Sequence, residues 1–131
     1  MAVSLSTVAR TAMMQAIITA AGATGARIKL YNGAIPPGVS AATGTLLATG
    51  FWNAGPIGVA TAGTLDWNEA GMSQNAANHI AGTPTFAQVL TSADVVVARV
   101  DFGGAPWTFT GAIAVNQNFA VTGLVFTAGN P

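Results

Sequence analysis

Two runs of alternating apolar and polar residues, joined by a short polar connector, form the clearest pattern in the chain. They extend from Gly82 to Gly103, and the connector covers Thr91 to Asp94. Runs rich in valine, phenylalanine and threonine with a period of two are typical of β-strands, and a polar connector between two such runs indicates a β-hairpin. The stretch therefore predicts the central hairpin of an antiparallel sheet.

A four-residue connector would place Leu90 opposite Val95 and give this hairpin two unlike faces. One face is almost wholly apolar and holds Thr85, Ala87, Val89, Val96, Ala98, Val100 and Phe102. The other face is apolar at one end and polar at the other, and holds Phe86, Gln88, Leu90, Val95, Val97, Arg99 and Asp101. We expect the first face in the core and the apolar part of the second, the back face, against a partner.

One helix is predicted, from Ser6 to Ala21. Ser6 or Thr7 can cap its first turn, and Gly22 is well placed to end it. At helical pitch one side carries Leu5, Ala9, Ala12, Met13, Ala16, Ile17 and Ala20. We expect this small-residue stripe to cover part of the chain's own sheet; the alternative is a helix that docks on a neighbouring subunit.

Further strands are indicated before and after the hairpin. They are expected at 27–31, 46–53, 59–61, 64–67, 107–110 and 119–127, with a polar loop over 68–78. The last of these strands is apolar on both faces, so that both must be covered. The pattern predicts a mainly β fold in a single domain over 1–131, an antiparallel β-sandwich (26–131) preceded by one N-terminal helix (1–22).

The scarcity of charge changes this picture. Charged residues make up 6% of the chain, against roughly 25% in ordinary soluble domains, and the net charge is zero. Free-standing domains keep charge on their surfaces to prevent association. We expect much of this surface to be covered by partners; the alternative is a neutral, threonine-rich surface of the kind that some secreted β proteins carry.

Candidate chemistry is sparse. His79 is the single histidine and is expected to be a polar loop residue, because a zinc site usually needs three or four ligands. Asp66 and Glu69 are expected in a solvated turn. There is no cysteine and no phosphate-binding or nucleophile motif. The sequence therefore predicts no enzyme, no cofactor and no metal, and its few basic residues and short apolar runs predict neither nucleic-acid nor membrane binding.

The large aromatic residues allow two interpretations. Trp52, Trp67 and Trp107, with Tyr31, lie in four separate segments. Aromatic residues scattered in this way are more often core or interface anchors. The alternative is an aromatic platform for carbohydrate.

Several segments resemble small structural proteins of tailed bacteriophages, including capsid decoration and cement-like proteins. The segments are ARIKLYNGAIPP, LLATG, TAGTLDW, GTPTFAQVLTS and FAVTGLVFT, in the same order as in those proteins. Two departures are Gln88, where an arginine is common, and Pro84, which cannot donate a ladder hydrogen bond. The resemblance implies a β-sandwich virion component and carries over no catalytic residue.

Together these features predict a structural virion protein, a capsid decoration or cement protein assembled in the host cytoplasm. Its expected partners are further copies of itself, in a trimer or ring, and other virion proteins such as the major capsid protein. The residues expected at the interface are Phe86, Leu90, Val95, Val97, Phe119, Val121 and Val125. A tail, collar or fibre component, or a receptor- or glycan-binding module, is the alternative.

Overall fold

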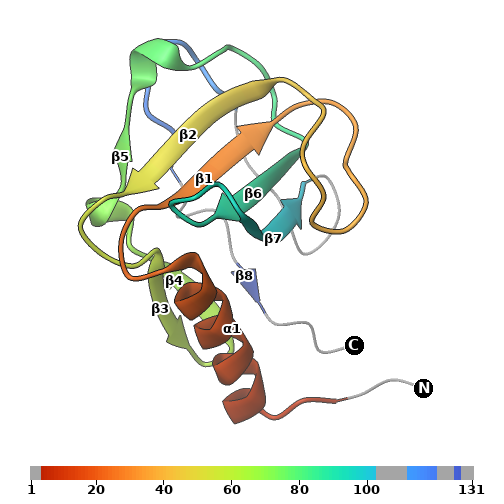
Figure 1. The fold of residues 1–131 in the computed structure, drawn as a ribbon, viewed down its shortest axis with the longest axis vertical. Coiled ribbons are helices and arrows are strands. Elements are labelled where there is room, and N and C mark those ends of the chain that lie inside the picture. The colour runs from red at the N-terminus through yellow and green to blue at the C-terminus, as the bar shows by residue number, and fades with distance from the viewer. Residues whose placement is uncertain (1–3, 103–111, 121–125, 128–131) are drawn as a thin grey trace.

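The computed structural model describes residues 4–102, 112–120 and 126–127, and within them the fold is mainly β (Figure 1). The elements in order are α1 (Thr7–Ala21), β1 (Ala26–Tyr31), β2 (Leu46–Trp52), β3 (Gly58–Thr61), β4 (Thr64–Trp67), the 3-10 turn η1 (Glu69–Gly71), β5 (Ser73–Gln74), the 3-10 turn η2 (Ala76–Asn78), β6 (Phe86–Leu90), β7 (Val96–Asp101) and β8 (Phe126–Thr127). The strands expected between residues 27 and 67 are confirmed. The expected strand at 107–110 and most of that at 119–127 lie outside the described residues.

A five-stranded antiparallel sheet forms the larger part of the fold, in the order β5-β2-β1-β6-β7. Its central strand, β1, pairs with β2 on one side and with β6, about sixty positions later in the chain, on the other. Alternate residues of these strands point inward, so Ile28, Leu30 and Val89 are fully buried. Figure 1 shows this twisted sheet above the helix and the smaller strands.

The smaller sheet consists of the hairpin β3–β4 and the two-residue strand β8. Trp67, at the end of β4, stacks on Trp52 of the large sheet with ring centroids 5.7 Å apart. Both tryptophans are buried, and the Trp52 indole N–H donates to the Asn68 carbonyl at 2.8 Å. These two tryptophans are therefore core residues, as the first interpretation expected, while Trp107 lies outside the described residues.

Helix α1 begins and ends where the sequence predicted but turns a different side toward the core. The Ser6 hydroxyl accepts from the Ala9 N–H, and Gly22 closes the helix with φ +103°. Its buried residues are Met14, Ile18 and Ala21, whereas most of the predicted stripe is exposed. The stripe prediction was wrong because apolar residues occur all around this helix, so periodicity alone cannot select the buried side.

Contacts with the hairpin β3–β4 fix the rotation of α1. The Gly63 N–H donates to the Thr11 hydroxyl at 2.8 Å, and Gly63 has φ +80° at the turn between the two strands. A Cβ on Gly63 would lie 3.0 Å from the Arg10 Cβ. The helix thus approaches the turn closely along the side that carries Arg10, Thr11 and Met14, and Met13 remains 46% exposed.

The register of the hairpin β6–β7 also differs from the prediction. Leu90 pairs with Val96, not with Val95, and a bulge separates this pair from Val89 and Ala98. Thr91 closes the longer turn, because its hydroxyl accepts from the Ala93 and Val95 N–H groups at 3.2 Å. Beyond the bulge the observed pairing differs from the predicted pairing by two residues. Each side chain there therefore stays on its predicted face.

Among the described residues, no helix has the length and apolarity needed to cross a membrane.

Candidate functional site

Half of the back face of the hairpin β6–β7 is covered by the chain's own β1–β2 loop, residues 32–45. The Arg99 guanidinium donates to the carbonyls of Pro36 and Gly38, and the Gln88 amide donates to the Ser40 carbonyl at 2.8 Å. Arg99 also makes a two-pronged ion pair with Asp101, at 2.5 and 2.9 Å. Because the loop lies over this half of the sheet, Gln88 is only 1% exposed.

The other half of the same sheet face, on β1, carries a small charge cluster whose basic side chains are half-buried. Asp94, at the hairpin tip, pairs with Arg27 at 2.9 Å and with Lys29 at 3.0 Å. The hydrogen bond from Lys29 and the positive charges of Lys29 and Arg27 together hold the pKa of Asp94 below its ordinary value, although desolvation acts in the opposite direction. Burial, and then the charge of Asp94, raise the pKa of Tyr31.

The predicted interface residues separate into three groups. Phe86, Leu90 and Phe119 are buried within the subunit, and the Phe86 ring stacks on Tyr31 at 5.2 Å. A buried side chain cannot be offered to a partner without rearrangement of the fold. Val95 is 60% exposed at the hairpin tip and Val97 is half-buried, while Val121 and Val125 lie outside the described residues.

Exposed apolar side chains that periodicity did not identify occur on several elements. Besides Val95, the large ones are Val8, Met13, Ile35, Val39, Leu46, Val59, Ile80 and Val115. Val8, on α1, is the most exposed at 80%.

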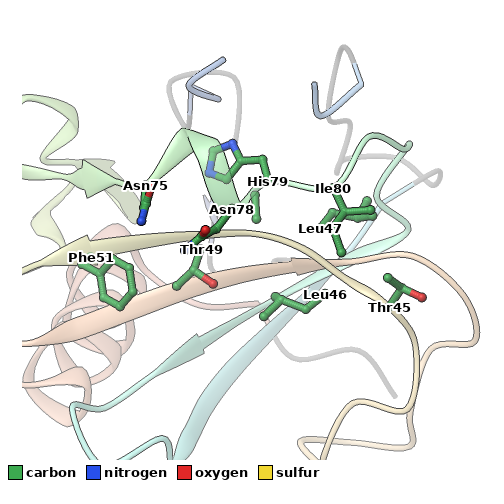
Figure 2. A pocket seen from close by; sticks show the side chains of 10 residues that line it. Thr45, Leu46, Leu47, Thr49, Phe51, Asn75, Asn78, His79 and Ile80 are labelled. Atoms are coloured by element: carbon green, nitrogen blue, oxygen red, sulfur yellow. The ribbon is translucent and has the colours of Figure 1, made fainter. Parts of the chain in front are cut away.

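A pocket with a volume of about 460 Å3 lies between β2 and the segment 75–80. Figure 2 shows Thr45, Leu46, Thr49 and Phe51 on the β2 side, opposite the residues of the segment. The pocket is lined by Thr45, Leu46, Leu47, Ala48, Thr49, Phe51, Asn75, Asn78, His79 and Ile80. The Ile80 N–H donates to the Leu47 carbonyl at 2.8 Å, which holds the segment against the strand.

His79 forms part of the pocket wall and is 4% exposed. His79 lies in a loop after the turn η2, as expected, but its ring also packs 5.8 Å from Phe119. Its Nδ1 donates to the Gln117 carbonyl at 2.9 Å, because a carbonyl can only accept. Its Nε2 is buried, with no hydrogen-bond partner among the described residues.

The other titratable residues singled out in the sequence do not gather around His79. Asp66 is exposed on β4, as expected, and Glu69 opens the turn η1. Within residues 4–102, 112–120 and 126–127, no three histidine, cysteine or carboxylate side chains lie close enough to hold a metal ion.

Comparison with known proteins finds no matching family model, and neither the curated proteins nor the solved structures give a significant match.

Proposed function

We propose that this protein is a structural protein of a tailed-phage virion, a capsid decoration or cement protein that assembles through apolar contacts. The resemblance in its Gly-, Ala- and Thr-rich segments supplies the class of protein. The property of the fold that supports it best is the number of exposed large apolar side chains: nine among the described residues are more than a third exposed.

The few charges of the chain do little to oppose association. Five of its eight charged residues form ion pairs with one another: Arg27, Lys29, Asp94, Arg99 and Asp101. Because these pairs largely cancel each other's fields, little electrostatic repulsion acts between copies. Burial of apolar surface contributes about 25 cal/mol per Å2 and depends little on salt, which suits permanent assembly.

Val95 is the predicted interface residue that remains best placed for such a contact. It stands at the tip of the hairpin with 60% of its surface exposed, next to Asp94 and its ion pairs with Arg27 and Lys29. Burial of a valine side chain contributes about 1.5 kcal/mol or more. Copies that bring hairpin tips together in a trimer or ring would bury several such side chains at once.

The proposal includes a complete β-sandwich. The stacked pair Trp52 and Trp67 supports it, since one ring comes from the large sheet and the other from the hairpin β3–β4. In this arrangement the two sheets face each other across the tryptophans, and exposed apolar groups outside them are free to contact partners.

Sedimentation velocity of the purified chain tests the assembly. We expect an oligomer that persists in molar salt, and we expect Val95→Asp to shift it toward the monomer while the circular dichroism spectrum stays unchanged. Ala93→Asp is the matched control, because it adds the same charge at an exposed position two residues away without removing a large apolar side chain. A monomeric wild-type chain, or an oligomer dispersed by salt alone, would refute the proposal.

A further inference from the structure

The pocket between β2 and the segment 75–80 has the size of a small-molecule site. Its volume of about 460 Å3 falls within the range of roughly 300–1,000 Å3 typical of ligand pockets, which are mostly apolar with a few well-placed polar groups. Two features of its lining, the polar side chains and the absence of charge, indicate which ligand chemistry would fit.

Four polar side chains face the pocket without a hydrogen-bond partner in the described part of the chain. They are the hydroxyls of Thr45 and Thr49 and the amides of Asn75 and Asn78. Asn75 precedes the turn η2 but makes no capping hydrogen bond with its side chain. Amides and hydroxyls both donate and accept, and sugar hydroxyl groups require the same combination.

The apolar part of the lining consists of one phenylalanine ring and four aliphatic side chains, those of Leu46, Leu47, Ala48 and Ile80. Phe51 supplies the ring, while Leu46 and Ile80 are 37% and 50% exposed. Flat carbon–hydrogen faces pack against aromatic rings with weak but additive interactions. A ring-shaped ligand with one apolar face and a polar edge would therefore use both parts of the lining.

The charges of the neighbourhood lie outside the pocket. None of the described residues that line it is aspartate, glutamate, lysine or arginine. Arg27 lies over the Phe51 ring at 5.6 Å but is paired with Asp94. An ionic ligand would find no counter-charge in the lining, so the chemistry favours a neutral one.

The wall of the pocket is held in place before any ligand binds. The His79 ring is fixed by its hydrogen bond to the Gln117 carbonyl and its contact with Phe119. Phe119 is in turn held by Gln74, whose side chain amide bonds to both backbone groups of Phe119, at 2.7 and 3.0 Å. A rigid wall lowers the entropy lost on binding.

We propose that this pocket binds a neutral sugar unit of an oligosaccharide, with Asn75, Asn78, Thr45 and Thr49 as hydrogen-bonding groups and Phe51 as the stacking surface. This activity goes beyond the proposed structural role and does not depend on it. It also differs from a tryptophan platform, because Trp52 and Trp67 lie in the core.

Titration of the full chain with soluble neutral tri- and tetrasaccharides of glucose, galactose and N-acetylglucosamine, followed by ¹⁵N chemical shifts, tests the proposal. We expect at least one probe to shift the amide signals of 45–51 and 75–80 with a dissociation constant in the millimolar range or tighter. Asn78→Ala and Asn75→Ala should each weaken that binding about tenfold, with an unchanged spectrum elsewhere.

Asn53→Ala is the control, since Asn53 is exposed and outside the pocket. Two results would overturn the proposal: no shift with any probe at millimolar concentration, or binding by the Asn75 and Asn78 variants equal to that of the wild-type chain. A change in oligomeric mass in these variants without a change in sugar binding would also overturn it, because the pocket would then be a subunit contact. Sedimentation of the wild-type chain decides the structural role separately.

Discussion

The two halves of the back face of the large sheet are formed by similar strands but are covered in different ways. Over β6 and β7, at Gln88 and Arg99, the face is closed by the chain's own loop, and the guanidinium of Arg99 bonds two loop carbonyls. At Arg27 and Lys29 the side chains are half-buried, and Asp94 from the hairpin tip pairs with both and offsets part of their positive charge. A half-apolar face therefore does not by itself require a partner, because a remote loop can cover it.

The largest change in the free energy of unfolding is expected on truncation of Phe86. The sequence predicted this residue at an interface, and the fold places it in the core. Phe86→Ala should destabilise the isolated subunit by about 3–5 kcal/mol, the cost of a large cavity, as measured by urea unfolding. Val95→Ala at the exposed tip should change the free energy of unfolding by no more than about 0.5 kcal/mol. Similar values for the two variants would mean that Phe86 is not packed within the subunit.

A second, smaller effect is expected from the residue that holds the loop. Arg99→Ala should destabilise the fold by about 2–3 kcal/mol, because it removes charge-assisted hydrogen bonds and leaves Asp101 without its partner. Hydrogen exchange should accelerate at the backbone amides of residues 38–40 and at the side-chain amide of Gln88, which bonds the loop. Arg10→Ala is the control for exchange in the loop, since it also removes an arginine side chain but one that lies against the turn at Gly63. Unchanged exchange in the loop would show that Arg99 does not hold it.

The smallest change in the free energy of unfolding is expected at Asp94, and it depends on pH. Because the pKa of Asp94 is lower in the folded chain than in the unfolded one, its ion pairs stabilise the fold above the unfolded value of about 3.9, and this contribution is lost as the pH falls through the folded value. Asp94 is half exposed, so we expect less than about 1 kcal/mol.

Asp94→Asn isolates this contribution, because asparagine tolerates the φ of +61° found there. The urea midpoints of the variant and the wild-type chain should differ at pH 7 and converge below pH 3, and molar salt should reduce the difference at pH 7. A constant difference at all pH values would assign the effect to the turn and not to the charge.

Local sequence patterns predicted where the helix and most strands lie, but not which distant segments they contact. The strand at 27–31, the cap at Ser6 and the stop at Gly22 follow from residues within one turn or one alternation, and they were predicted correctly. The pocket was not predicted, because Phe51 and Asn78 belong to segments that carry no shared motif. His79 was expected only to be a polar loop residue, since nothing near it in sequence indicates the contact with Phe119.

The sequence by itself determined the positions of most described strands, the single helix and the scarcity of charge, because these depend on composition and on periods of two or 3.6 residues. The tertiary structure alone decided the hairpin register, the buried side of α1 and the covering of Phe86 and Gln88. Each of these depends on a contact between distant residues, such as Arg99 with Pro36, 63 positions apart. Alternation assigns a side chain to a face, but only the packed chain determines what covers that face.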